Sequence, residues 1–228
     1  VQTCALPISY SAFIKLAERS LVSSSPEQFI RVSNDGLVSS KPIKGTRPRG
    51  ENAHQDAAIA AELQQDKKER AENLMIVDLM RNDIGKVSRV GTVSVPKLFE
   101  IESYATVHQL VSTVTGQLED DETAWSAVLA AFPGGSMTGA PKIRAMEIIQ
   151  DLEKGPRGVY SGCLGYLAAD GSAEFAMTIR SIVFKDGVAT IGVGGGITID
   201  SDAEQEFEEI KIKARALLSA IGAQDPWR

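Results

Sequence analysis

The sequence predicts an α+β fold with mainly antiparallel sheets. Extended segments come in hairpin runs that helical segments interrupt, whereas a doubly wound fold would alternate strands and helices one by one. Two turn signals support the hairpins: Asn34-Asp35-Gly36, in which Gly36 accepts positive φ at low cost, and Lys185-Asp186-Gly187. The 228 residues, 43% of them hydrophobic, are enough for one large domain with a sizeable core.

Each element is predicted from a local pattern. Loose alternation and Val- and Thr-rich runs predict strands over residues 10–16, 21–25, 29–32, 37–43, 87–95, 105–118, 159–169, 175–184 and 188–193. Apolar spacings of three and four, together with cap residues, predict helices over residues 56–80, 123–132, 141–154 and 203–220. Pro141 suits a first helical turn, and Asp200-Ser201-Asp202 caps the last helix. Residues 47–52 are expected to form a loop.

Composition excludes several classes of function. The net charge of -6 argues against non-specific nucleic-acid binding, which needs a positive face. The sequence has no run of about 18 apolar residues, so no membrane span is predicted. The N-terminus does not resemble a signal peptide. Two cysteines, Cys4 and Cys163, do not make a disulfide framework, so we expect a cytoplasmic location. The first residue is not Met, and we expect the chain to be a fragment.

The last predicted helix carries two carboxylates and a lysine on one face. Glu206, Glu209 and Lys213 follow one another at three- and four-residue steps beside an apolar stripe. Such a face is compatible with a binding site. The alternative is an ordinary Glu209–Lys213 pair, worth only about 0.2–0.5 kcal/mol.

Glu72 is harder to explain as a surface residue. It shares a helix face with the apolar Met75, Ile76 and Leu79, and a carboxylate there is costly unless a cation or metal compensates it. Glu72 and Glu209 together would give a magnesium ion two oxygen ligands.

Two glycine runs could bind anions. Residues 132–142 precede a helix, but Ala140-Pro141 stands where a P-loop needs Lys-Ser/Thr. Residues 192–196 follow a hairpin rather than lie in a βαβ crossover, which argues against a dinucleotide fingerprint. Tight turns without a ligand are the alternative for both.

Three further charged residues allow two interpretations each. Glu27 follows a serine-rich stretch at a strand-to-turn position. Arg180 lies in a run predicted as a strand, where it could pair with a substrate carboxylate or be an ordinary edge-strand arginine. Lys44 lies in the basic run Lys41-Pro42-Ile43-Lys44-Gly45-Thr46-Arg47, which usually means a solvated surface. Burial among other cations would instead lower its pKa and free the amine as a nucleophile.

Several motifs together resemble the chorismate-utilising enzymes, a family that includes anthranilate synthase component I, aminodeoxychorismate synthase component I, isochorismate synthase and salicylate synthase. The similarity extends from about Tyr10 to Ala220. The motifs are Ser25-Pro26-Glu27, Pro42-Ile43-Lys44-Gly45-Thr46-Arg47, residues 72–79, Arg81-Asn82-Asp83, residues 135–142, Tyr160-Ser161-Gly162 and the glycine run into Asp200-Ser201-Asp202.

The resemblance implies a four-layer α/β/β/α sandwich and a set of site residues. Glu72 and Glu209, supported by Glu206, would bind Mg²⁺, which would hold the ring carboxylate of chorismate. Lys213 and Ser136 would help to hold that carboxylate, and Glu27 would be the general acid for departure of the C4 hydroxyl. The implied ligands of the enolpyruvyl carboxylate are Tyr160, Arg180 and the backbone N–H groups of Gly194, Gly195 and Gly196.

Lys44 distinguishes the branches of the family. Anthranilate synthases resemble this segment but usually have alanine at the lysine position, whereas aminodeoxychorismate synthases have lysine. The resemblance therefore implies that the Lys44 amine adds to C2 as the C4 hydroxyl leaves, and that ammonia then adds at C4 and expels the lysine. A glutamine amidotransferase partner would supply the ammonia, and the product, 4-amino-4-deoxychorismate, leads to 4-aminobenzoate and folate.

The sequence departs from the family pattern in three places. Gln109 stands where many relatives have a histidine linked to pyruvate elimination, and glutamine cannot relay a proton. Residues 1–8 resemble nothing in the family, and we interpret them as an unrelated segment or artefact. Residues 9–221 are expected to be a partial catalytic domain that lacks its first strands, and residues 222–228 a tail. Two alternatives stay open: anthranilate synthase component I, or a truncated, non-catalytic chorismate-binding module.

Overall fold

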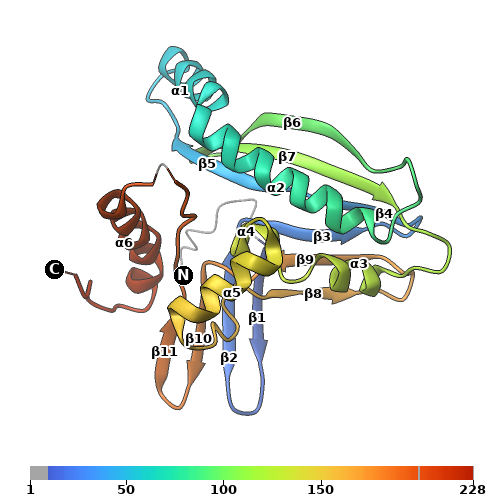
Figure 1. Cartoon of the computed structure of the whole chain (residues 1–228). Helices are drawn as coiled ribbons and strands as arrows, with labels where there is room; N and C mark the ends of the chain where they lie inside the picture. The colour runs from blue at the N-terminus through green and yellow to red at the C-terminus, as the bar shows by residue number, and fades with distance from the viewer. Residues whose placement is uncertain (1–9, 200, 228) are drawn as a thin grey trace.

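The computed structural model describes residues 10–199 and 201–227, which form two antiparallel sheets with helices (Figure 1). The predicted α+β class with two antiparallel sheets is confirmed. Residues 1–8, for which the sequence predicts an unrelated segment, lie outside the described residues, as does Asp200 of the predicted cap. None of the helices formed by the described residues is long and apolar enough to span a bilayer.

The smaller sheet has four strands in the order β1-β2-β10-β11. Ser23 of β2 pairs with Ser181 of β10, and the Ser181 hydroxyl donates a hydrogen bond to that of Ser23. The strands are β1 (Tyr10–Lys15), β2 (Ser20–Ser25), β10 (Ser181–Lys185) and β11 (Val188–Ile191).

The larger sheet has seven strands in the order β5-β7-β4-β3-β9-β8, with β6 also paired to β7. β7 is its longest strand and pairs with three others. The strands are β3 (Gln28–Val32), β4 (Leu37–Ser40), β5 (Ile43–Pro48), β6 (Ser94–Ser103), β7 (Val107–Gln117), β8 (Cys163–Leu167) and β9 (Ala173–Met177).

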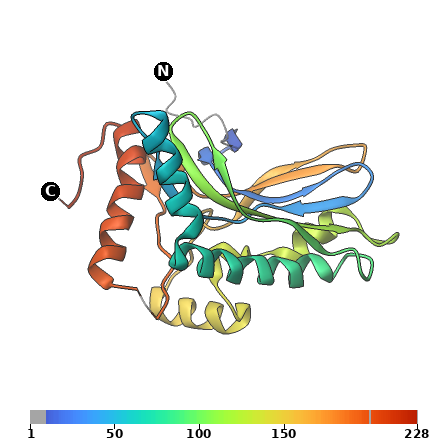
Figure 2. The same cartoon turned by 90° about the horizontal axis from the view of Figure 1, so that it is seen from above.

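The helices cover the larger sheet and close one end of the molecule (Figures 1 and 2). Ile76, Val77, Met80 and Ile84 of α2 are buried in one core cluster with residues of the sheet, which fixes α2 across its face. In both views α6 stands at one end of the molecule. The helices are α1 (Ala53–Gln65), α2 (Lys67–Gly85), α3 (Ala124–Ala131), α4 (Gly135–Thr138), α5 (Lys142–Glu153) and α6 (Ala203–Ala220).

The prediction of a single helix over residues 56–80 is wrong, because the helix is interrupted at Asp66. The Asp66 backbone is extended, and its carboxylate accepts a hydrogen bond from the N–H of Glu69, so Asp66 ends α1 and caps α2. Other boundaries differ as well. The strand predicted over residues 37–43 is interrupted, because β4 ends at Ser40 and β5 begins at Ile43. The loop predicted over residues 47–52 begins later, because β5 continues to Pro48. Of residues 87–93, predicted as strand, only Ser88 forms a bridge, and β6 begins at Ser94.

The strand predicted over residues 175–184 is two strands in two different sheets. β9 ends at Met177 in the larger sheet, and β10 begins at Ser181 in the smaller one. The residues between them, with Arg180 at φ 51°, carry the chain from one sheet to the other. Likewise, residues 159–162 form a turn before β8, not the beginning of the predicted strand.

Candidate functional site

The chain passes between the two sheets twice, and the two crossings lie side by side. Glu27 lies on the first, between β2 and β3, and Arg180 on the second, between β9 and β10. The N–H of Met177 donates to the carbonyl of Glu27 at 3.1 Å, and the N–H of Ser24 donates to the carbonyl of Arg180 at 3.1 Å. Sheet topology therefore brings together two charged residues that are far apart in sequence. Arg180 is not the edge-strand residue of the alternative interpretation.

Glu27 is buried in an environment that favours its protonated form. A cavity of about 10 Å³ adjoins it, close to the space of a single water molecule. Burial raises the pKa of Glu27; a hydrogen bond with Ser136 and the positive charges of Lys44 and Arg180 act in the opposite direction without cancelling the rise. A carboxyl group that keeps its proton above the usual range is suited to act as an acid. The cavity is lined by Glu27, Gln28, Phe29, Ser40, Pro42, Ile76, Met80, Gly134, Gly135 and Ser136.

Ser136 is placed by two glycines that allow very close packing. A Cβ on Gly134 would lie 2.7 Å from Sδ of Met177, and one on Gly135 would lie 2.5 Å from Cδ2 of Leu79. Only residues without side chains allow α4 to lie this close to β9 and α2. The turn thus fixes the Ser136 hydroxyl against Glu27.

Lys44 is mostly buried, unlike a solvated surface cation. Its side chain is 18% exposed, and Nζ lies 3.4 Å from Oε2 of Glu72 on α2. Between Ile43 and Thr46 the pairing of β5 with β7 shifts register, and Gly45 at φ 79° accommodates the irregularity. The other cations of the basic run, and Arg49 just after it, are bound elsewhere: Lys41 pairs with Glu102, Arg47 with Asp66 and Glu69, and Arg49 with Asp56.

Of the three predicted metal ligands, Glu72 and Glu206 converge and Glu209 stands slightly apart. Lys68 Nζ lies 3.9 Å from Oε1 of Glu72 and 3.4 Å from Oε1 of Glu206. Both of these carboxylates are largely buried, with side chains 12% and 7% exposed. Glu209 is 48% exposed and forms its ion pair with Lys213. Lys213 also donates to the carbonyl oxygen of Gly194 at 2.9 Å, so its pairing is more than an ordinary helix-surface contact.

The glycine run passes between Tyr160 and the charged groups. A Cβ on Gly192 would lie 2.2 Å from the Tyr160 ring, and one on Gly194 would lie 2.8 Å from its hydroxyl. On the other side, a Cβ on Gly195 would lie 3.0 Å from Oε2 of Glu206, and one on Gly196 would lie 3.2 Å from Nζ of Lys44. The run is therefore glycine-rich because side chains would fill the space that these groups share.

Tyr160 and Arg180 are electrostatically coupled. Burial raises the pKa of Tyr160, while the charges of Arg157 and Arg180 and a hydrogen bond with Ser161 oppose the rise. Burial lowers the pKa of Arg180 against the charges of Tyr160, Glu27 and Glu209. A cation so removed from water is a good partner for a carboxylate ligand.

Sequence reasoning identified Gln109 but missed Lys68. Gln109 lies on β7 opposite Thr46 of β5; it is buried, and its Oε1 has no hydrogen-bond partner among the described atoms. A buried acceptor of this kind calls for a donor from water or ligand. Lys68 could have been found from its i,i+4 spacing to Glu72. Its second partner, Glu206, lies 138 positions away and leaves no local signal.

The carboxylates fit a divalent ion held by two side chains rather than three. Within residues 10–199 and 201–227, no group of three or more His, Cys, Asp or Glu side chains is arranged to hold a metal. Glu72 and Glu206 nevertheless face one cationic atom, and carboxylate oxygens are the donors that Mg²⁺ takes, often one or two at a time.

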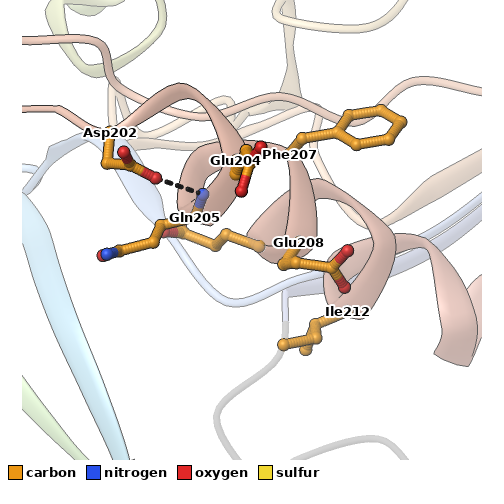
Figure 3. Close-up of a pocket in the computed structure, with 7 residues that line it drawn as sticks. Asp202, Glu204, Gln205, Phe207, Glu208 and Ile212 are labelled. Carbon is orange, nitrogen blue, oxygen red and sulfur yellow. Dashed lines mark hydrogen bonds between the residues drawn. The ribbon is translucent and has the colours of Figure 1, made fainter.

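Besides the small cavity at Glu27, a pocket of about 730 Å³ lies on α6. This hollow is separate from the place where Glu72 and Glu206 converge. Figure 3 shows its lining, with Phe207, Glu208 and Ile212 projecting from the helix and the carboxylate of Asp202 accepting from the N–H of Gln205. Only Glu209 belongs both to this hollow and to the predicted site. The converging side chains of Lys44, Glu72 and Glu206 therefore define the candidate site, and the hollow does not.

Comparisons with known proteins show the family to which the chain belongs. A family model described as chorismate binding enzyme matches residues 5–219. Aminodeoxychorismate synthase of Streptomyces pristinaespiralis is 56% identical over 215 residues, which cover 94% of this chain and 30% of that protein. Anthranilate synthase component 1 of Methanothermobacter marburgensis is 49% identical over 215 residues, covering 94% of this chain and 46% of that protein. The chain thus spans less than half the length of either relative.

Solved structures share the fold. Anthranilate synthase component I from Streptococcus pneumoniae superposes with a TM-score of 0.83 at 40% identity, over 92% of this chain and 46% of that one. MenF, the menaquinone-specific isochorismate synthase from Escherichia coli, gives a TM-score of 0.77 at 25% identity, over 88% of this chain and 46% of that one. The chain belongs to the chorismate binding enzyme family.

Proposed function

We propose that the chain forms the chorismate-binding part of an aminodeoxychorismate synthase, which converts chorismate and ammonia to 4-amino-4-deoxychorismate. The observation that carries the proposal is Lys44: a largely buried amine, 3.4 Å from Glu72, whose charge also acts on the Glu27 carboxyl. An amine and an acid that face the same space can act on the same ring.

The first step divides between these two side chains. The Lys44 amine first gives up its proton to water, and its lone pair then bonds to C2 of the ring while the Glu27 carboxyl gives its proton to the C4 hydroxyl, which leaves as water. Ammonia then bonds to C4, the bond between Lys44 and C2 breaks, and the amine is regenerated. A covalent lysine divides one difficult substitution into two easier ones.

The remaining residues would bind and orient chorismate. Arg180 and Tyr160, with the backbone N–H groups of Gly194–Gly196, would hold the enolpyruvyl carboxylate; Lys213 and Ser136 would help with the ring carboxylate. Glu72 and Glu206, with Glu209 alongside, would hold Mg²⁺. When bound, the ion would supply positive charge to anchor the ring carboxylate.

Two further parts of the proposal rest on the family resemblance and composition. A glutamine amidotransferase would deliver the ammonia, and the product would lead to 4-aminobenzoate and folate. The predicted cytoplasmic location rests on the low cysteine content, and Cys163 is a free thiol.

The second candidate is anthranilate synthase component I, because relatives of that name are 46–50% identical to this chain. Two residues favour the first candidate: Lys44, where the second usually has alanine, and Gln109, which cannot relay the proton that pyruvate elimination requires. Incubation with chorismate, Mg²⁺ and ammonium separates the two. We expect a product that forms 4-aminobenzoate only after a lyase is added, whereas fluorescent anthranilate formed directly and in quantity would reject the proposal.

A further inference from the structure

Lys68 occupies the position between the two converging carboxylates of the candidate site. It lies in the first turn of α2, one turn before Glu72, and its Nζ reaches across to Glu206 of α6. The Lys68 side chain is 51% exposed, whereas the side chains of Glu72 and Glu206 are nearly buried. Its amine therefore enters the site while most of its stem remains close to solvent.

The local backbone does not explain a lysine at this position. Positive charge is unfavourable at a helix N-terminus, because the helix dipole already places partial positive charge there. The acidic residues of the site provide the compensation. Lys68 Nζ lies 3.4 Å from Oε1 of Glu206 and 3.9 Å from Oε1 of Glu72. Two of the three carboxylates implied as metal ligands thus lie within ion-pair distance of this one ammonium group.

We propose that Lys68 is an internal counter-cation for Glu72 and Glu206, which a divalent metal ion must displace in order to bind. This inference rests on the proposed function, which assigns Mg²⁺ to the same carboxylates. Mg²⁺ needs its ligand oxygens at about 2.0–2.1 Å. An ammonium on those oxygens would then lie close to a doubly charged ion in a site of low dielectric, where repulsion is strong. The flexible, half-exposed stem of Lys68 lets the amine swing into water.

The proposal predicts an effect with an unusual sign: removing a site residue strengthens metal binding. In Lys68→Met, Mg²⁺ no longer competes with an ammonium, and we expect roughly fivefold tighter binding by titration calorimetry, the size of one partly exposed ion pair. Without metal, the same variant should unfold at lower denaturant concentration than the wild type, because Glu206 loses its cation and Glu72 keeps only Lys44. Added Mg²⁺ should reduce this difference in stability between Lys68→Met and the wild type, because the ion binds the folded variant more tightly.

Two control variants separate this effect from net charge and from misfolding. Lys67→Met removes the same charge from the neighbouring, exposed position and should leave Mg²⁺ affinity close to that of the wild type. Lys68→Arg keeps a cation between the carboxylates and should not tighten binding. Both variants preserve helix-forming residues, so they also report on the folding of α2.

The outcomes distinguish failure of the inference from failure of the proposed metal site. If Glu72→Gln abolishes Mg²⁺ binding but Lys68→Met leaves it unchanged or weaker, the metal site stands and the counter-cation role is overturned. If neither the wild type nor Lys68→Met binds Mg²⁺, both the metal site of the proposed function and the counter-cation role of Lys68 are refuted. Tighter binding in Lys68→Met, with Lys67→Met unchanged, supports the proposal.

Discussion

The side-chain nitrogen of Asn73 donates a hydrogen bond to the carbonyl oxygen of Pro42 at 3.2 Å. Asn73 is fully buried on α2, next to Glu72, and Pro42 comes just before β5, two residues ahead of Lys44. Ser112 of β7 completes the link: its hydroxyl donates to Oδ1 of Asn73 at 2.5 Å, and its N–H donates to the Pro42 carbonyl at 3.2 Å. This buried network fixes the helix that carries Glu72 against the strand that carries Lys44.

We expect Asn73→Ala to cost about 1–3 kcal/mol of unfolding free energy, because the Ser112 hydroxyl loses its buried acceptor and the Pro42 carbonyl loses one of two donors. Denaturant titration measures the loss. Asn82→Ala is a matched control, because Asn82 also lies on α2 but is exposed. Equal stability of the two variants would show that the network does not hold β5 to α2.

The raised pKa of Glu27 predicts how stability depends on pH. A carboxyl group whose pKa is higher in the folded than in the unfolded protein binds its proton more tightly when folded. Its contribution is therefore complete below the unfolded value of about 4.5 and is lost as pH rises through the folded pKa. Glu27→Gln cannot ionise, so it should gain stability relative to the wild type as pH rises through that window.

Denaturant titrations of both proteins from about pH 4 to about pH 8 test the direction of this change. Within the window, each pH unit should change the difference in unfolding free energy between the two proteins by up to about 1.4 kcal/mol. A difference between wild type and Glu27→Gln that does not change with pH would mean that burial does not favour the neutral carboxyl. If Glu27 is also the acid of the proposed reaction, Glu27→Gln should lose most amination activity at every pH.

Gly192→Ala tests the close approach of the glycine run to Tyr160. The added methyl would start 2.2 Å from the ring, so the ring or the run must move, at about 1–3 kcal/mol. Chorismate binding should weaken as well, if this run and Tyr160 hold a carboxylate. Gly155→Ala is the control, because a Cβ added at Gly155 would meet no atom closer than the Glu153 carbonyl oxygen, at 3.9 Å, apart from its adjacent residues. Unchanged stability and binding in Gly192→Ala would refute the steric account.

The fold class could be predicted because strand alternation, turn residues and caps are local signals. Asp202 caps α6 through the N–H of Gln205, and the Lys185–Val188 hairpin forms where Lys185-Asp186-Gly187 predicts a turn. The break at Asp66 escaped prediction because helix-forming residues continue on both sides of it.

The passage between sheets at residues 178–180 could not be predicted for a different reason. Residues 175–184 form one apolar, β-favouring run, and local preference does not say to which sheet each half belongs. The position of Arg180 beside Glu27 depends on that passage, and so does its removal from water. Local preference could not identify Lys68 either, because its position in the site depends on contact with Glu206, on a helix that is distant in sequence.

The formation of a covalent bond between Lys44 and chorismate is the central claim, and intact-mass spectrometry tests it directly. The purified protein is mixed with chorismate and Mg²⁺ without ammonium, quenched rapidly in acid and analysed beside Lys44→Ala. We predict that the wild-type protein gains the mass of chorismate less one water and that Lys44→Ala gains nothing. Amination by the wild type without any adduct, or the same adduct on Lys44→Ala, would contradict the claim.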